Sequence, residues 1–184
     1  MTNPAARETV GGGVAMPASK QLALVAMLLA IGAVLRAFTP PLFGITPNFV
    51  IAMYCLAILL VRPGFGGALG IGLVGGAVCM FLSKSPIPYL NLITEPIGAL
   101  ACVLIVRYLP ELALKRYAFK PIVATTVGTL ASGTSYITLN FFVFLNMPFE
   151  AWQAAFLGVV LPVTLINAVL TQLLYAPSKR FLRA

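Results

Sequence analysis

The stretch SPIPYLNLITEPIGALACVLIV, residues 85–106, is long enough and apolar enough to cross a membrane as a helix. Near its start it carries three polar side chains, Asn91, Thr94 and Glu95. A carboxylate in the hydrocarbon region costs roughly 2.5–3.5 kcal/mol on insertion scales, so acids inside spanning helices are rare and mark functional sites by default. Because the chain has only four acidic residues, the position of Glu95 is the first feature to explain.

The overall composition agrees with a membrane location. Of the 184 residues, 60% are hydrophobic and 9% are charged, whereas soluble domains carry about 25% charged residues. The net charge of +8 comes from basic residues placed between hydrophobic runs, where they set membrane topology and do not indicate nucleic-acid binding. The chain has no His, and Cys55, Cys79 and Cys102 all lie inside apolar runs, so we expect no metal site, cofactor or disulfide framework.

Apolar runs that can form spanning helices cover residues 21–38, 46–61, 65–82, 88–106, 121–144 and 151–175. We expect every run to be helical, because lipid offers no partner to backbone polar groups. The sequence therefore predicts an all-α integral membrane protein, a compact bundle of six transmembrane helices within residues 21–184. Residues 1–20 are polar, rich in Gly and Ala, and lack the apolar core of a signal peptide, so we expect a disordered cytoplasmic tail.

The distribution of basic residues predicts the orientation of this bundle. If the N-terminus is cytoplasmic, only Arg36 and Lys84 of the 12 Lys and Arg residues fall on the outer side. Basic residues collect on the cytoplasmic side of membrane proteins, and an even number of spans returns the chain to its starting side. We therefore expect both termini to be cytoplasmic.

With this orientation, polar side chains from two spans meet near the outer surface. Asn91 and Glu95 are four residues apart and share one face of the fourth span, with Thr94 beside it. The fifth span carries a polar stripe at helical spacing, which consists of Thr125, Thr129, Ser132, Tyr136 and Asn140. The outer end of the stripe reaches the depth of Glu95.

This convergence predicts an outward-facing pocket for a small ligand. We expect Glu95 and Asn91 to hydrogen-bond a polar or cationic group of that ligand. Aromatic side chains, Phe43, Tyr89 and Tyr136, are expected to cover its apolar body.

Structural explanations of the same residues stay open. Glu95 could form an ion pair with Arg36 or Lys84, which would leave no charge for a ligand. Arg36 could instead extend to the membrane surface from the end of its span. The threonines of the stripe could bond a backbone carbonyl or a neighbouring helix, and Asn140 could cap the end of the fifth span.

The glycines of the third span predict close helix packing. The pairs Gly66–Gly70 and Gly72–Gly76 each place small residues four apart, which lets a neighbouring backbone approach. GIGLVG, residues 70–75, also matches a dinucleotide-binding pattern, but that pattern requires a preceding strand. In the middle of a membrane span the match is accidental.

Three segments resemble a known family. AMLLA at residues 26–30, PPLFGITPNFVIAMYCLAILL at 40–60 and IPYLNLITEPIGA at 87–99 are similar to the substrate-binding S components of energy-coupling factor (ECF) transporters. Within that group the last two segments resemble the tryptophan-transporter type. The resemblance covers roughly residues 20–110.

The resemblance implies an importer of the bacterial plasma membrane and not an enzyme. Such a protein captures a vitamin, an amino acid or a related metabolite from outside, and delivers it with a membrane coupling subunit and two cytoplasmic ATPases. The small residues of the first span, here Ala26, Ala30 and Ala33, would dock onto the coupling subunit. Tight packing inside the chain is an equally good explanation of these alanines.

The chain departs from the tryptophan-type pattern at two places. Asn48 stands where the pattern has an acidic residue, and Thr94–Glu95 stands where it has an Asp–Lys pair. Asn48 and Thr94 are therefore candidate ligand contacts with altered charge. The fold and transport class follow from the resemblance, whereas tryptophan as the substrate does not.

Two other functions remain as alternatives. A solitary or proton-coupled carrier could use Glu95 as its proton site and act without ATPases. A membrane-embedded enzyme or assembly factor is disfavoured, because the chain lacks His and has no cytoplasmic cluster of carboxylates.

Overall fold

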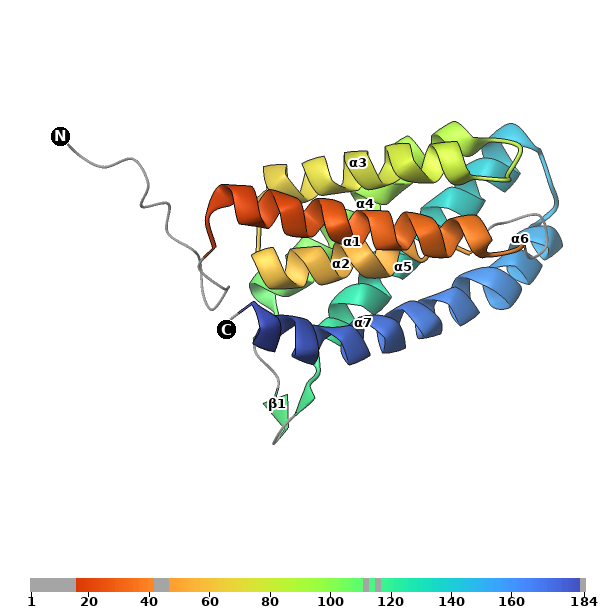
Figure 1. The fold of residues 1–184 in the computed structure, drawn as a ribbon. Helices are drawn as coiled ribbons and strands as arrows, with labels where there is room; N and C mark the ends of the chain where they lie inside the picture. The colour runs from red at the N-terminus through yellow and green to blue at the C-terminus, as the bar shows by residue number, and fades with distance from the viewer. Residues whose placement is uncertain (1–15, 42–46, 111–112, 115–116, 183–184) are drawn as a thin grey trace.

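Long apolar helices lie side by side over most of the chain (Figure 1). The computed structural model describes residues 16–41, 47–110, 113–114 and 117–182. The α-helices are α1 (Ala18–Phe38), α2 (Val50–Val61), α3 (Phe65–Leu82), α4 (Asn91–Tyr108), α5 (Lys120–Thr138), α6 (Phe149–Ala155) and α7 (Leu161–Phe181). A 3-10 turn, η1 (Pro88–Leu90), precedes α4, and the π-helical segments η2 (Leu139–Phe144) and η3 (Phe156–Val160) follow α5 and α6.

The predicted fold class, a membrane bundle of six helical passes, is confirmed. Because α6, η3 and α7 follow one another without a break, they form the single sixth pass. Among the described residues, four helical segments are long and apolar enough to cross a membrane: Ala18–Phe38, Phe65–Leu82, Pro88–Tyr108 and Phe149–Phe181. The polar-striped α5 is not one of them. A short antiparallel pair, β1 (Ala113–Leu114) and β2 (Tyr117–Ala118), lies between α4 and α5 and was not predicted.

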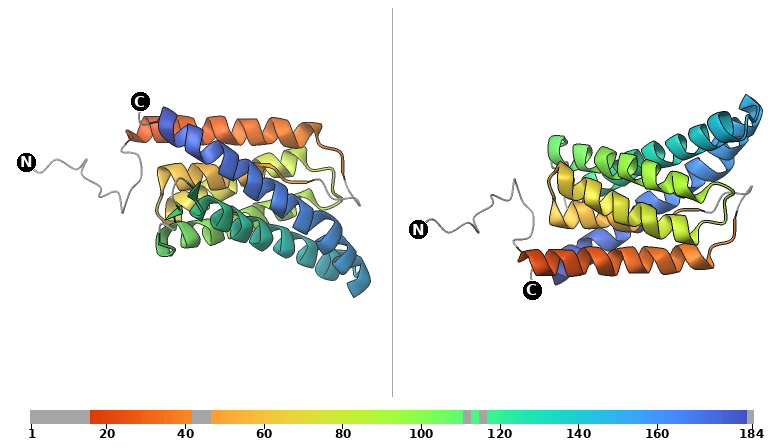
Figure 2. Two further views of the ribbon diagram at one scale, coloured as in Figure 1. Left: turned by 90° about the horizontal axis from the view of Figure 1, so that it is seen from below. Right: turned by 90° about the horizontal axis from the view of Figure 1, so that it is seen from above.

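The start of α1 and the end of α7 lie at the same end of the bundle, together with the β1–β2 pair (Figures 1 and 2). This arrangement is what an even number of passes requires. The cytoplasmic location of that end stays a prediction. Of the predicted tail, residues 1–15 lie outside the described residues, and α1 already begins at Ala18.

Helix α2 forms the centre of the bundle. It packs against α1, α3, α4, α5 and α7, and every residue from Val50 to Leu60 is buried. Its sequence is hydrophobic on all sides, as expected for a helix surrounded by others. Its 12 residues span only about 18 Å at 1.5 Å per residue, against a hydrocarbon thickness of about 30 Å. The second pass is therefore shorter than the predicted 46–61, and space is left beyond its N-terminal end.

The glycines of α3 pack as predicted at one pair and not at the other. A Cβ on Gly72 would lie 2.7 Å from the Cα of Pro96, and one on Gly76 would lie 2.6 Å from the carbonyl oxygen of Asn91. Both glycines therefore allow close contact with the backbone of α4. Around Gly66 and Gly70 no described atom lies within 4 Å of such a Cβ, so the predicted close packing at that pair is wrong.

Because the two glycine pairs differ in packing, α3 contains both a test position and a control position for a stability measurement. Gly76→Val should destabilise the protein by about 1–3 kcal/mol, because the added side chain must separate α3 from α4. Gly70→Val should change stability by less than about 0.5 kcal/mol, as expected at an uncrowded position. Thermal unfolding in detergent measures both, and equal losses in the two variants would contradict the packing described here.

Candidate ligand-binding site

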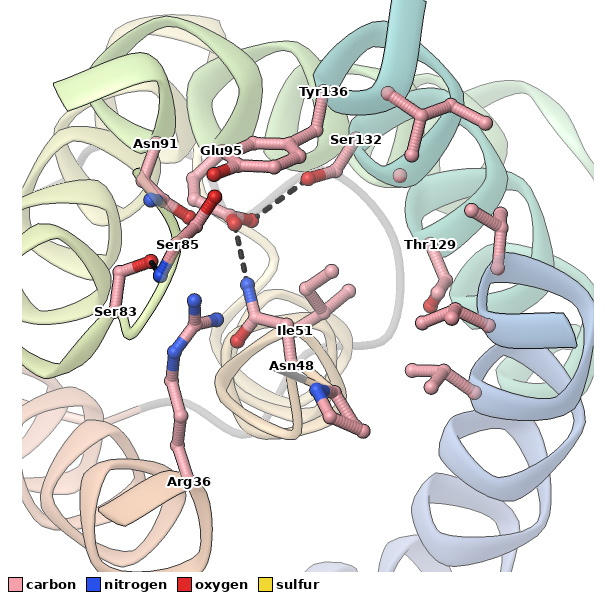
Figure 3. Close-up of a pocket in the computed structure, with 16 residues that line it drawn as sticks. Arg36, Asn48, Ile51, Ser83, Ser85, Asn91, Glu95, Thr129, Ser132 and Tyr136 are labelled. Atoms are coloured by element: carbon pink, nitrogen blue, oxygen red, sulfur yellow. Dashed lines mark hydrogen bonds between the residues drawn. The ribbon is translucent and has the colours of Figure 1, made fainter. Parts of the chain in front are cut away.

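A cavity lies beside the last turn of α1, in the space beyond the N-terminal end of the short helix α2. Figure 3 shows the residues that line it. Its void measures about 50 Å³. Polar side chains enter it from α1, the segment before α2, the α3–α4 connection, α4 and α5. The segments η3 and α7 contribute only valines, Val159, Val160 and Val163. The cavity therefore has a polar side and an apolar side.

Glu95 lies on the polar side and is held by neutral donors. The Asn48 amide Nδ2 donates to carboxylate oxygen Oε1. The other oxygen, Oε2, accepts hydrogen bonds from the Ser132 hydroxyl at 3.0 Å and the Tyr54 hydroxyl at 3.2 Å. The side chain is only 1% exposed. These donors orient the carboxylate without neutralising its charge.

No cation among the described residues forms an ion pair with Glu95. The predicted alternative, a pair with Arg36 or Lys84, is therefore absent from that part of the chain. Lys84 is exposed, whereas Arg36 lines the same cavity as Glu95. A buried acid that borders a void and lacks a cationic partner is open to a cationic group of a ligand.

Small residues explain how so many helices reach Glu95. Gly72 lets α3 contact the turn of α4 that contains Glu95 and Pro96. One turn further, a Cβ on Gly98 would lie 2.8 Å from the carbonyl oxygen of Gly128 on α5. The close approach of α5 brings Ser132 to the carboxylate.

Arg36 occupies the last turn of α1 and is 3% exposed. The expectation that it extends to the membrane surface is wrong. Its guanidinium points into the cavity, on the side of Ser83, Ser85 and Asn48 (Figure 3). The short α2 leaves room for this inward orientation.

Four of the predicted site residues line the cavity: Asn48, Asn91, Glu95 and Tyr136. Asn91 donates from Nδ2 to the carbonyl of Pro88 at 2.6 Å, so part of its hydrogen-bonding capacity serves the start of α4. The Tyr136 hydroxyl donates to the carbonyl of Ile87 at 3.3 Å. Both side chains thus help to fix the wall of the cavity as well as facing it.

Three other predicted site residues, Thr94, Asn140 and Tyr89, do not line the cavity, and the prediction for Phe43 lies outside the described residues. Thr94 is buried, but it is not part of the cavity wall. Asn140 is buried inside η2 and does not cap the end of α5. Tyr89 is 49% exposed and contacts the ring of Phe144 edge-on, at 5.8 Å between centroids. A contact between these residues and a ligand stays a prediction.

Several lining residues were not predicted as ligand contacts. Ser132 and Thr129 belong to the predicted polar stripe of α5, so the stripe itself was a usable signal. Tyr54 does not line the cavity, but it lies in the middle of an apolar run and only the structure shows that its hydroxyl reaches Glu95. Ser83 and Ser85 come from a connection that gave no signal beyond its polarity.

The cavity therefore combines one buried anion, one buried cation and neutral donors with an apolar wall. Such a site suits a small amphiphilic molecule that carries charge at one end. An apolar helical bundle with this cavity defines a membrane protein that handles a small molecule.

Comparison with known proteins identifies the family. The family described as Tryptophan transporter TrpP matches residues 18–183. The chain belongs to this tryptophan transporter family. The resemblance noted in residues 20–110 is thus confirmed, and it extends through the C-terminal third of the chain.

Two curated relatives support this assignment. A probable tryptophan transport protein of Clostridium acetobutylicum is 30% identical over 171 residues, which cover 89% of this chain and 94% of the relative. A probable tryptophan transport protein of Bacillus subtilis is 28% identical over 167 residues, which cover 90% and 94%. No solved structure matches the chain significantly. The chain is therefore a multi-pass transport protein of a bacterial membrane.

Proposed function

We propose that the protein is the substrate-capturing S component of an ECF-type importer and that it binds tryptophan or a closely related amino acid from outside the cell. A membrane coupling subunit and two cytoplasmic ATPases would drive release on the inside. The observation that carries the proposal is the buried Glu95 carboxylate, which faces a cavity with an apolar wall and is held only by neutral donors. The tryptophan in the names of the family and of both relatives supports the choice of substrate.

The polarity of the cavity fits an amino acid with an apolar side chain. Glu95 can accept the ammonium group, because a cation beside a buried carboxylate is favoured electrostatically. Val159, Val160 and Val163 can cover the ring. Neutral vitamins would leave the charge of Glu95 without a counterpart.

The size of the void indicates that binding moves the wall. The void of about 50 Å³ is smaller than the cavity of about 150 Å³ that accepts benzene in an engineered protein. An indole ring therefore enters only if side chains at the apolar side shift. Val160 already packs closely against Gly133, where an added Cβ would lie 3.0 Å from its Cγ1, so this valine is a side chain that has to shift.

The proposed orientation and docking surface have separate support. On the side of the chain termini, the helix ends contain or adjoin four basic residues: Lys20, Arg62, Arg107 and Lys179. This distribution fits a cytoplasmic location of that side.

The proposed docking surface lies on α1, where Ala26 and Ala30 are exposed and Ala33 is half-buried. Small exposed residues allow a partner helix to approach closely, so this face of α1 is the proposed contact with the coupling subunit.

Uptake by reconstituted vesicles tests the transport class. Vesicles with this chain alone should bind radiolabelled tryptophan without accumulating it. Accumulation should require the coupling subunit and both ATPases. It should also require ATP in the vesicle lumen, which the cytoplasmic side of the complex faces. Accumulation by the chain alone, driven by a proton gradient, would instead establish the solitary carrier.

A further inference from the structure

The buried arginine at the end of α1 has unused hydrogen-bonding capacity. Arg36 is 3% exposed, and its side chain extends into the cavity (Figure 3). Its Nε and Nη1 atoms are buried and have no hydrogen-bond partner in the described part of the chain. An unpaired buried donor costs about 1–3 kcal/mol, and more when the group is charged. These N–H groups therefore need a hydrogen-bond acceptor.

The described residues around the cavity do not supply a carboxylate for this arginine. Glu95 lines the same cavity, but its oxygens accept hydrogen bonds from Asn48, Ser132 and Tyr54, and no ion pair joins it to Arg36 in the described part of the chain. Glu150 is exposed and does not line the cavity. The guanidinium and Glu95 thus line one cavity without forming an ion pair.

We propose that Arg36 binds the α-carboxylate of the amino-acid substrate, and that it is the residue that makes a free carboxylate a requirement for binding. This inference rests on the proposed function and extends it to a second charged group. A guanidinium presents N–H donors in a planar fork that matches the two oxygens of a carboxylate. With Glu95 facing the ammonium group, the two charges fix the direction in which the substrate lies.

The arrangement predicts how the site selects among indole compounds. Tryptophan has both charged groups, tryptamine lacks the carboxylate, and indole-3-propionate lacks the ammonium group. A site built to bind a polar group strongly rejects an analogue without it, because its own buried groups are then left unpaired. Arg36 should therefore account for the rejection of tryptamine, and Glu95 for the rejection of indole-3-propionate.

Binding titrations of purified variants test this assignment. In the wild type, tryptophan should bind at least about 100-fold more tightly than tryptamine. Arg36→Gln should weaken tryptophan binding roughly 10- to 100-fold, the loss of a charge-assisted hydrogen bond or a forked pair. The same change should leave tryptamine binding within about threefold of the wild type. Arg36→Lys keeps the charge without the fork and should give an intermediate loss for tryptophan only.

Lys84→Gln is the matched control. It removes the same charge next to two cavity-lining serines, but Lys84 itself is exposed and does not line the cavity. It should leave the preference for tryptophan unchanged. Thermal unfolding identifies any variant that fails to fold, and Arg36→Lys then decides the outcome.

The outcomes separate this inference from the proposed function. Equal losses for tryptophan and tryptamine in the Arg36 variants would overturn the carboxylate assignment, because a purely structural role affects both compounds alike. Unchanged tryptophan affinity in Arg36→Gln would overturn it as well. If the folded wild type binds none of the three compounds, the proposed substrate is wrong and the assignment falls with it.

Discussion

Glu95→Gln should lower the affinity of the protein for tryptophan by about 100-fold or more. Removing one partner of a buried charge pair costs roughly 2–5 kcal/mol, and each 1.4 kcal/mol corresponds to a factor of ten. In the wild type the carboxylate accepts hydrogen bonds only from neutral donors, so it can still form an ion pair with the substrate ammonium group. A binding titration with purified protein measures the effect.

The local geometry predicts that Glu95→Gln remains folded. The new amide oxygen can accept from Asn48, as Oε1 does now. The new amide nitrogen can donate to the hydroxyl oxygens of Ser132 and Tyr54, because a hydroxyl can accept as well as donate. Glu150→Gln is the matched control, since it removes an exposed acid at the same end of the bundle. An affinity within threefold of the wild type for Glu95→Gln would remove Glu95 from the site.

Ala30→Trp should abolish uptake while leaving substrate binding intact. Ala30 is exposed in the middle of α1, whereas the residue of this helix that lines the cavity is Arg36 in its last turn. If this face contacts the coupling subunit, a bulky ring holds the two backbones apart and prevents docking. Uptake by vesicles that contain the complete complex should fall to background, whereas the tryptophan affinity of the isolated chain should change less than about twofold.

Val169→Trp provides the control for that experiment. Val169 is 58% exposed on α7, so the variant places the same ring on another outward-facing helix. It should retain uptake. If Ala30→Trp transports normally, the docking face lies elsewhere on the molecule. If both variants lose uptake together with binding, the ring disturbs the bundle itself.

The fold was predictable because hydropathy and lipid chemistry act on long segments. Each predicted span contains a helical pass, and the start of α3 at Phe65 agrees to the residue. The start of α2 was placed four residues too early, because hydropathy over a long window does not resolve Thr46, Pro47 and Asn48 at the edge of the apolar run. Hydropathy does not reveal that the chain stops being helical before Val50.

Site residues were predictable only where their positions follow from spacing along a single helix. Asn91, Glu95 and Tyr136 were found from depth and from spacing along single helices. The contact between Asn48 and Glu95 joins residues 47 positions apart, which spacing along a single helix does not encode. Asn48 became a candidate only through the family resemblance.

The orientation of the Arg36 side chain also depends on contacts outside its own helix. At the end of an apolar span, an arginine with a long aliphatic stem is expected to reach the membrane surface. It turns inward here because the central helix α2 is short and leaves space at its N-terminal end. That space follows from packing among five neighbouring helices, so the orientation of Arg36 could not be derived from its own sequence context.

The central claim is that the cavity beside Glu95 holds the transported molecule. An experimental structure of the protein in complex with tryptophan tests it most directly. We expect the ammonium group next to Glu95, on the side where Ser132 and Asn48 already orient the carboxylate, and the indole ring against Val160. Tryptophan bound at another site, with the cavity still closed around an unoccupied Glu95, would contradict the claim.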